Sequence, residues 1–433
     1  MSSKTQTTAP PEEATPALVP KLRFPGFQDD WEMTPIGEKV DLLSGYPFDG
    51  PDICEDRRGV RLLRGINITE GRIRHSPEID RYYTGETGGL EKFRVRLNDL
   101  VIGMDGSKVG KNSSLISDDD ADALLIQRVA RLRTSSPTLI QFIFQQINST
   151  TFHSYVDKIN TSSGIPHISA KQIKEFTVGF PSPAEQQKIA ECLSSVDELM
   201  AAQARKVDAL KTHKKGLMQQ LFPREGETQP RLRFPEFQNA GEWEVRTIGE
   251  MFSLINGCAF KPEDWKPTGT PIIRIQNLND PSAEFNYSQE PVPERNRVES
   301  GDLLFAWSGT LGSSFGARIW NGPSGVLNQH IFKVLMDDQQ IILQFALLVL
   351  ARVEEEIARR THGFKASFVH VKKADLVQVE MLLPSIPEQQ RIATCLSSLD
   401  ALITAETQKH EALKTHKKGL MQQLFPSPEE VGA

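Results

Sequence analysis

The sequence predicts a mixed α/β fold in which a tandem duplication gives two α/β domains, separated by two long helices that form an antiparallel coiled coil. The stretch LKTHKKGLMQQLFP occurs at 210–223 and again, without a difference, at 413–426. Upstream, SPAEQQKIAECLSSVDEL from Ser182 matches SIPEQQRIATCLSSLDAL from Ser385 at the same spacing of 203 residues. A period near 200 residues is too long for a solenoid, so each repeat is a domain followed by a helix.

A third repeated block fixes where each half begins. PKLRFPGFQDDWEMTPIGE from Pro20 matches PRLRFPEFQNAGEWEVRTIGE from Pro230. The predicted order along the chain is a disordered leader (1–20), a first domain (21–181), a first conserved helix (182–223), a linker (224–230), a second domain (231–384), a second conserved helix (385–426) and a tail (427–433). The leader is rich in Thr, Pro, Ala and Glu, which cannot form a core.

Composition narrows the class of protein. The chain has 433 residues, 38% of them hydrophobic, with a net charge of -6, as expected for a soluble globular protein of about two or three domains. The longest apolar run, 341–351, is far shorter than the roughly 20 residues of a membrane span. The four cysteines show no C-x-x-C spacing. We expect a cytoplasmic protein with reduced thiols and no membrane contact.

Local signals delimit the two helices. Ser182 with Glu185, and Ser385 with Glu388, fit the S-x-x-E capping box. Apolar residues recur at heptad spacing along both helices, which predicts two seams that face each other. The residues predicted to mediate helix pairing or subunit docking are Ile189, Leu193, Val196, Leu210, Leu217, Leu221, Ile392, Leu396, Leu399, Leu413, Leu420 and Leu424.

Polar residues interrupt both seams near their middles. In an antiparallel pair Gln203 and Glu406 both fall there, where a polar layer can fix the register of the helices. Alternatively, both side chains simply point to solvent. Antiparallel pairing would relate the two halves by an approximate two-fold axis.

The domains between these blocks diverge in sequence. Short strands are predicted at VRLLRGINI, DLVIGM and LIQRVARLR in the first domain and at PIIRIQNL, DLLFAW and NQHIFKVL in the second. A helix is predicted near 139–150 and another near 341–358. The two domains therefore share a similar skeleton but carry different side chains.

Arginines concentrate near the start of the first domain, where seven lie between Arg57 and Arg81. The planar guanidinium suits guanine edges and phosphates. The whole domain is nevertheless close to neutral, and acidic runs such as SDDDAD from Ser117 are usually solvated faces. Nucleic-acid binding would therefore need a localised basic face.

Other polar residues occupy matching positions in the two domains. Asn67, Asn277 and Gln276 follow an arginine on aligned strands, where they could address adenine or could simply form a turn at the strand end. His167 aligns with His370, and each either lies on a DNA-facing loop or caps the next helix.

No catalytic constellation is recognisable in the sequence. There is no N-P-P-Y type motif for amino methylation and no G-x-G-x-x-G at the start of a helix. DGSKVGKN near Gly106 has the wrong spacing for a phosphate loop, and no acidic-x-Lys follows Pro51-Asp52. The chain alone is expected to be neither a methylase nor a nuclease.

The paired LRFPxF…W…TIGE blocks, the P-x-E-Q-Q-[KR]-I-A helix starts, the K-K-G-L-M-Q-Q-L-F helix ends and GDLLFAWSGTLG at Gly301 resemble the specificity subunit of type I restriction-modification systems. The resemblance extends over residues 21–426. It departs at DLVIGMDGSKVGK, which lacks the Trp-Ser-Gly of the second half, and at SSGIPHI, which differs from KASFVHV.

The resemblance implies a noncatalytic subunit with two target recognition domains, each of which reads half of a bipartite sequence in double-stranded DNA. It implies two methyltransferase subunits for adenine-N6 methylation and restriction subunits for cleavage as partners. S-adenosylmethionine, ATP and Mg are expected only in those partners, with no cofactor and no metal in this chain. The candidate DNA-binding residues are Arg57, Arg58, Arg61, Arg64, Asn67, Lys108, Lys111, Ser163, His167, Arg274, Gln276, Asn277, Ser308, Lys365 and His370.

One alternative function belongs to a different class. The chain could be a noncatalytic coiled-coil scaffold whose paired domains bind protein or glycan partners, since its overall charge is not basic. Retention on DNA in the presence of methylase subunits distinguishes the two functions.

Overall fold

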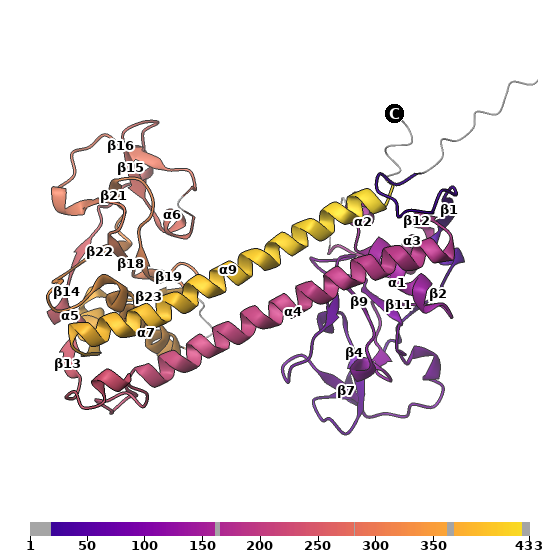
Figure 1. Ribbon diagram of the computed structural model, residues 1–433, viewed down its shortest axis with the longest axis horizontal. Coiled ribbons are helices and arrows are strands. Elements are labelled where there is room, and N and C mark those ends of the chain that lie inside the picture. The colour runs from indigo at the N-terminus through magenta and orange to yellow at the C-terminus, as the bar shows by residue number, and fades with distance from the viewer. Residues whose placement is uncertain (1–18, 161–164, 281, 362–367, 427–433) are drawn as a thin grey trace, which may run out of the picture. The chain divides into compact units, whose positions relative to one another are not determined.

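A computed structural model describes residues 19–160, 165–280, 282–361 and 368–426. The chain divides into two compact units, unit 1 (Met1–Arg205 with Thr407–Ala433) and unit 2 (Lys206–Glu406), coloured in Figure 1 by position along the chain. The division falls inside both long helices, α4 (Pro183–Leu221) and α9 (Ile386–Leu424). Each unit therefore contains half of each helix. The predicted tail and nearly all of the predicted leader lie outside the described residues.

Unit 1 contains two four-stranded sheets and two short strand pairs. The first sheet has the order β2 (Asp41–Ser44), β11 (Val129–Arg133), β8 (Leu100–Gly103) and β9 (Ser113–Leu115), all antiparallel. The second has the order β10 (Leu124–Leu125), β4 (Val60–Leu63), β7 (Arg81–Tyr83) and β3 (Ile53–Cys54), with β10 and β4 parallel. The short pairs are β1 (Glu32–Pro35) with β12 (Thr177–Phe180), and β5 (Ile68–Thr69) with β6 (Arg72–Ile73).

Strand β8 shows how one strand serves two cores. Its four residues are all buried, because side chains alternate between two covered faces. Leu100 and Ile102 join the main core, and Val101 joins a smaller core that includes Leu63 and Leu125 of the second sheet. Three helices complete unit 1: α1 (Pro137–Ile147), α2 (Thr150–Ile159) and α3 (Ala170–Glu175).

Unit 2 repeats this plan. Its antiparallel sheet has the order β14 (Phe252–Asn256), β22 (Ile331–Met336), β18 (Leu303–Ala306) and β20 (Gly316–Ile319). Its mixed sheet has the order β16 (Asn286–Ser288), β15 (Thr270–Ile273), β21 (Gly325–Leu327) and β17 (Arg297–Val298). The short pairs are β13 (Glu244–Thr247) with β24 (Glu380–Leu383), and β19 (Ser308–Thr310) with β23 (Phe368–His370).

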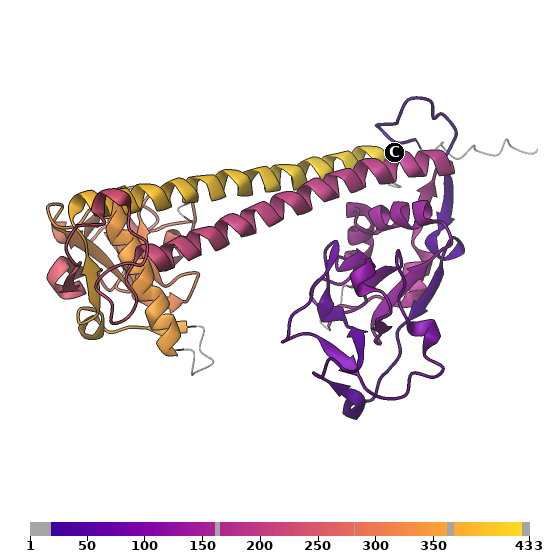
Figure 2. The same cartoon turned by 60° about the horizontal axis from the view of Figure 1, so that its bottom comes forward.

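The helices of unit 2 are α5 (Ile248–Met251), α6 (Ile275–Asn279), α7 (Leu343–Thr361) and α8 (Lys373–Leu376). In Figure 2, α7 lies beside the halves of α4 and α9 that belong to this unit. Arg352 on α7 donates to the carbonyl of Pro223 at 3.0 Å. Within the described residues, no helix is both long enough and apolar enough to cross a bilayer.

The ends of the long helices belong to the domain cores. In unit 1, Leu193 from α4 and Leu424 from α9 lie in one core, where the Phe425 ring meets Phe142 at 5.8 Å. In unit 2, Leu221 from α4 and Leu396 from α9 do the same. Each domain is therefore closed by helix ends that come from both repeats. This burial explains why the apolar positions of the helix ends recur in both copies.

A buried ion pair explains the other repeated blocks. Nε and the second amino group of Arg23 each donate to one oxygen of Glu185 at 2.8 Å. Arg233 makes the same two bonds to Glu388 at 2.7 Å. Both carboxylates are 1% exposed. The arginine of each LRFP block thus holds the start of its helix.

The predicted capping box is therefore only half present at the first helix. The backbone N–H of Glu185 donates to Oγ of Ser182 at 3.4 Å, but the carboxylate binds arginine and does not return to the backbone of Ser182. The capping prediction for Glu185 and Glu388 is wrong in this respect. A long-range ion pair outcompetes the local contact, because a buried carboxylate requires a counter-charge.

The predicted seam residues are buried or half-buried throughout. Near the middle of the seam, Glu406 is only 3% exposed and its carboxylate receives the Lys206 ammonium at 2.9 Å. The alternative that Glu406 points to solvent is therefore wrong.

Candidate nucleic-acid interface

Four segments meet at one edge of the strands in unit 1 and form what we call the unit 1 corner: residues 64–67, 104–108, 126–128 and His167. The N–H of Met104 donates to the carbonyl of Arg128 at 2.9 Å, and that of Ile126 to Leu63 at 3.2 Å. Asp105 forms a β-bridge with His167. Residues from the first three segments line an open cavity of about 700 Å³.

Unit 2 assembles the same corner from residues 274–277, 307–309, 328–330 and His370. The N–H of Trp307 donates to the carbonyl of His330 at 3.2 Å, and that of Asn328 to Ile273 at 3.0 Å. Ser308 pairs with His370 between β19 and β23. The two corners therefore share the same pattern of backbone hydrogen bonds and strand pairing. This pattern makes Met104 equivalent to Trp307, Asp105 to Ser308, Arg128 to His330 and His167 to His370.

Both corners begin with the same arginine turn. The N–H of Arg64 donates to Oδ1 of Asn67 at 3.2 Å, and that of Arg274 donates to Oδ1 of Asn277 at 3.1 Å. The asparagines are 1% and 0% exposed, and each side-chain amide donates to a backbone carbonyl of its own unit. The turn interpretation of these two asparagines therefore holds, and their predicted contact with adenine is excluded in this conformation.

This turn also corrects the predicted strand at VRLLRGINI. Strand β4 ends at Leu63 and a 3-10 turn, η3 (Gly65–Asn67), follows. In unit 2, PIIRIQNL likewise divides into β15 and α6. The asparagine closes the turn by binding the backbone three residues earlier, which a strand pattern does not reveal.

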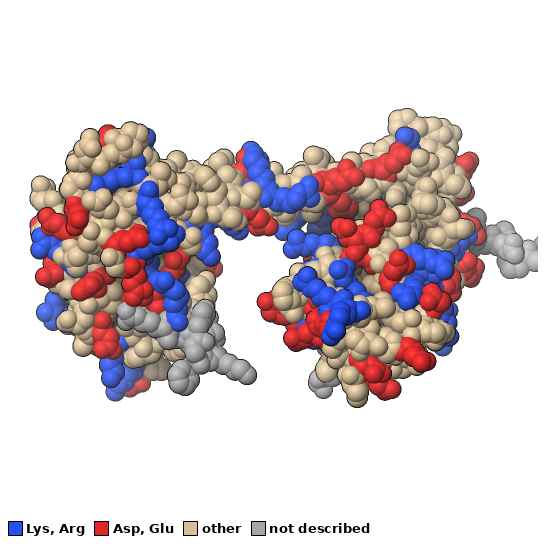
Figure 3. Space-filling view, turned by 90° about the horizontal axis from the view of Figure 1, so that it is seen from below, with Lys and Arg blue, Asp and Glu red and all other residues tan. Residues whose placement is uncertain are grey.

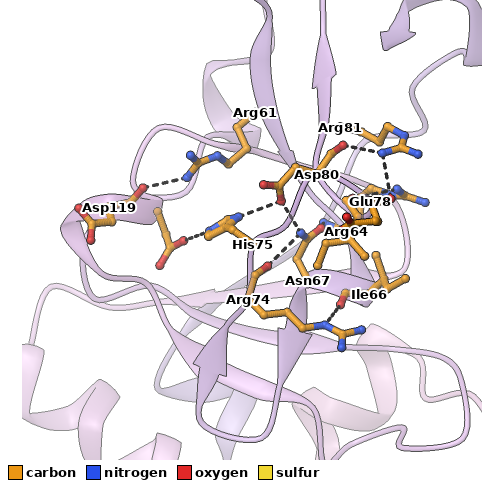
Figure 4. A network of polar contacts seen from close by, with 12 residues as sticks. Arg61, Arg64, Ile66, Asn67, Arg74, His75, Glu78, Asp80, Arg81 and Asp119 are labelled. Carbon is orange, nitrogen blue, oxygen red and sulfur yellow. Dashed lines mark hydrogen bonds and ion pairs between the residues drawn. The ribbon is translucent and has the colours of Figure 1, made fainter. Parts of the chain in front are cut away.

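An ionic network braces the unit 1 turn from behind (Figure 4). Nδ1 of His75 lies 2.9 Å from Asp80, and Nε2 lies 2.7 Å from Asp120. Asp80 also accepts from the amide of Asn67 at 3.1 Å. Each ring nitrogen therefore lies within hydrogen-bond distance of one carboxylate. The network fixes Asn67 and, through it, the backbone of Arg64.

In unit 2, aromatic side chains pack near the equivalent turn. Phe285 immediately precedes β16, as Asp80 immediately precedes β7, and its ring meets Trp320 at 6.4 Å. At the corner itself, the centre of the Trp307 ring lies 5.3 Å from that of the His330 ring and 4.7 Å from that of the His370 ring. The guanidinium of Arg274 lies over Trp265 at 5.0 Å. One corner is therefore ionic and the other largely aromatic.

The other predicted arginines and lysines of unit 1 are mostly accessible. Arg57 and Arg58 are exposed, and Arg58 pairs with Asp56. Arg61 is half-buried and donates to the carbonyl of Asp119 at 3.0 Å. Lys108 is exposed and meets Glu70 at 3.0 Å, while Lys111 is half-buried. These residues are spread over several elements, and of this group only Lys108 lines the cavity.

The remaining predicted residues divide into three groups. His167, His370 and Gln276 are exposed. Ser308 is 5% exposed, so its hydroxyl is largely covered. Ser163 and Lys365 lie outside the described residues.

The sequence did not predict several corner residues, namely Asp105, Gln127, Arg128, Trp307, Gln329 and His330. Gln127 and Arg128 lay inside a predicted strand, yet they form the loop between β10 and β11. Arg128 has a φ of +66°, which non-glycine residues rarely adopt. The signal that could have found them is the aligned pair Gln-Arg and Gln-His in otherwise apolar segments.

Charge on the corners is local. Figure 3 shows Lys and Arg interspersed with Asp and Glu on the visible face of each unit. The cavity of unit 1 nevertheless gathers four basic side chains, from Arg64, Arg74, Lys108 and Arg128, against the carboxylates of Glu70 and Asp105. No group of three or more His, Cys, Asp or Glu in the described residues is arranged to hold a metal ion.

The model of the type I restriction modification DNA specificity domain matches residues 65–212 and again residues 240–415. The chain belongs to this family. The MjaVIII specificity subunit of a type I restriction enzyme from Methanocaldococcus jannaschii is 23% identical over 434 residues, covering 93% of each chain. The putative MjaX specificity subunit of the same organism is 25% identical over 437 residues, covering 94% of this chain and 95% of the relative.

A solved structure agrees with the fold. The S subunit of a type I restriction-modification system from M. genitalium aligns with a TM-score of 0.54 at 17% identity, over 94% of this chain and 99% of that one. The first matched range contains the unit 1 corner except for Arg64, which lies one residue before it, and the second range contains the whole unit 2 corner, so the chain carries the DNA specificity module twice.

Proposed function

We propose that this specificity subunit binds double-stranded DNA with one unit on each half of a bipartite sequence. The observation that carries the proposal is the pair of corners: the same backbone hydrogen bonds present different side chains in unit 1 and unit 2. A frame kept constant around variable side chains is what two readers of different half-sites require, because sequence is read by base-edge contacts. Basic side chains around the unit 1 corner, such as Arg74 and Lys108, would hold the phosphates there.

We propose that α4 and α9 pair as an antiparallel coiled coil. Two ion pairs support this. In unit 1, Nζ of Lys417 lies 2.7 and 2.8 Å from the two oxygens of Asp197. In unit 2, Lys214 lies 2.6 and 2.7 Å from those of Asp400. Lys214 and Lys417 occupy equivalent places in the repeat, as do Asp197 and Asp400, so one contact occurs twice in a two-fold related manner. Each joins the early part of one helix to the late part of the other.

The repeated helix surfaces would dock two methyltransferase subunits. Fourteen identical residues at 210–223 and 413–426 present the same exposed side chains twice, among them His213 and His416. Two like partners require two like surfaces. In this proposal the chain itself is noncatalytic. The partners carry S-adenosylmethionine for adenine-N6 methylation, and restriction subunits with ATP and Mg add cleavage in the cytoplasm.

Methylome sequencing of a host with and without this gene tests the proposal. The expected result is a bipartite adenine-methylated motif, two short specific parts separated by an unspecified spacer, that disappears with the gene. Coexpression of the chain with its methylase subunits should restore it. An unchanged methylome, or methylation by the purified chain without a partner, would overturn the proposal.

A further inference from the structure

We propose that Asp105 and Arg128 of the unit 1 corner together read one G·C base pair in the major groove, and that this pair of positions is a specificity determinant. The inference rests on the proposed function. Unit 2 has Ser308 and His330 at the equivalent positions, as the shared backbone hydrogen bonds establish.

The two side chains are accessible and lie together. An amino group of Arg128 lies 3.2 Å from Oδ2 of Asp105, and their side chains are 66% and 32% exposed. An exposed pair of this kind contributes little to stability, so exchanging it for contacts with a base costs little. The pair keeps both groups extended at the mouth of the cavity in the free protein.

The backbone beneath them is held firmly. The carbonyl of Arg128 accepts from the N–H of Met104 at 2.9 Å, and the N–H of Gln127 donates to Tyr46 at 2.9 Å. Arg128 itself adopts a left-handed conformation with φ of +66°. An uncommon backbone state fixed by hydrogen bonds on both sides aims the side chain before DNA arrives, which reduces the ordering cost of binding.

The chemistry of the pair matches a G·C edge. Guanine presents O6 and N7 as acceptors to the guanidinium fork, and cytosine presents its N4 amino group as a donor to a carboxylate. A carboxylate at the mouth of a basic cavity would repel phosphate, so Asp105 suits a base edge better than the DNA backbone. Arg74 and Lys108 around it are the groups suited to flanking phosphates.

Unit 2 lacks both the carboxylate and the guanidinium at these positions. Ser308 is 5% exposed, and His330 lies against Trp307. Nδ1 of His330 and Nε1 of Trp307 are buried and make no hydrogen bond. This corner therefore cannot offer the fork and carboxylate that a G·C pair would engage, and the two units should differ in base preference at this point.

The test uses the full chain assembled with its methylase subunits and DNA duplexes that carry the motif found by methylome sequencing. Each guanine of the first half-site is replaced in turn by 7-deazaguanine, which lacks N7. We expect one position at which the replacement weakens binding about ten-fold or more. At that position Arg128→Ala should bind the natural and modified duplexes equally. Asp105→Ala should reduce discrimination against A·T at the same base pair.

Matched variants separate this proposal from the proposed function. Arg96→Ala removes an exposed arginine of unit 1 that does not line the cavity and should leave discrimination intact. His330→Ala should change only the second half-site. If Arg128→Ala weakens all duplexes equally, Arg128 is a phosphate contact and the G·C proposal fails while the proposed function stands. If no variant affects binding of the motif, and the motif persists without the gene, the proposed function fails as well.

Discussion

The two corners of this molecule are built on one backbone and stabilised by different chemistry. Unit 1 holds its arginine turn with His75, Asp80 and Asp120, while unit 2 sets Phe285 against Trp320 at the matching place. The ion pairs that anchor the long helices, in contrast, are alike in the two units. The distance between the charged groups is 2.8 Å in Arg23–Glu185 and 2.7 Å in Arg233–Glu388. The contrast teaches that the helices and their anchors are held constant, while the two corners vary both at their surface and in the side chains packed behind it.

The largest effect should come from breaking the constant frame. Arg23→Ala and Arg233→Ala each leave a carboxylate that is 1% exposed without its counter-charge. We expect each substitution to lower the free energy of unfolding by about 3–5 kcal/mol, and the two losses to be alike. Denaturant titration measures both. Arg246→Ala, which removes an exposed pair with Glu244, is the control and should cost less than about 1 kcal/mol. Unequal losses would show that the frame is not equivalent in the two units.

The next largest effect is a dependence of the stability of unit 2 on pH, which arises from Glu354. Burial raises the pKa of Glu354 on α7 to about 7, although the N–H of Ala317 donates to its carboxylate and opposes the shift. Because this pKa exceeds the unfolded value of 4.5, the folded state retains a proton that the unfolded chain releases. The protonated carboxyl group of Glu354 therefore contributes its full stabilisation to unit 2 below pH 4.5, and this stabilisation is lost as the pH rises to about 7.

Glu354→Gln should remove this dependence. The wild type should lose up to about 3 kcal/mol of unfolding free energy between pH 4.5 and 7.5 relative to the variant, at about 1.4 kcal/mol per pKa unit. Thermal unfolding at several pH values, monitored by a probe on unit 2, measures the difference. Parallel pH profiles for the two proteins would contradict the prediction.

A smaller effect should be confined to unit 1. His75→Ala removes the ring that contacts both Asp80 and Asp120, which are 7% and 8% exposed. We expect a loss of about 1–3 kcal/mol, since two buried carboxylates lose a hydrogen-bond partner. Binding to the first half-site should weaken and binding to the second should not. His213→Ala, on an exposed face of α4, is the stability control. Equal weakening at both half-sites would mean that the network does not serve the corner.

The sequence predicted what repetition and periodicity encode. The three repeated blocks predicted two α/β domains and two long helices, and the structure contains α4 and α9, each of 39 residues. The resemblance to type I specificity subunits is confirmed by the family match over both halves. These features are local or periodic, so they can be recognised along the chain.

The corner could be predicted only in part. Arg64 and Arg274 were found because each follows a strand, but the burial of Asn67 and Asn277 depends on contacts with carbonyls six or seven residues away. Asp120 reaches His75 across 45 residues, and Arg128 reaches Asp105 across 23. Partners brought together by the tertiary fold leave no spacing signal in the sequence. Glu185 was assigned to a cap for the same reason.

The central claim is that each unit reads its own half of the target, and methylome sequencing with matched variants tests it most directly. Arg64 and Arg274 occupy equivalent turns. If each makes a bidentate base contact, replacing it by alanine should cost about 1 to 3 kcal/mol of binding free energy at its own half-site. We predict that Arg64→Ala relaxes the methylated motif on one side of the spacer only, and that Arg274→Ala relaxes it on the other side only. Relaxation of the same side by both variants, or a uniform loss of methylation with an unchanged motif, would contradict the account.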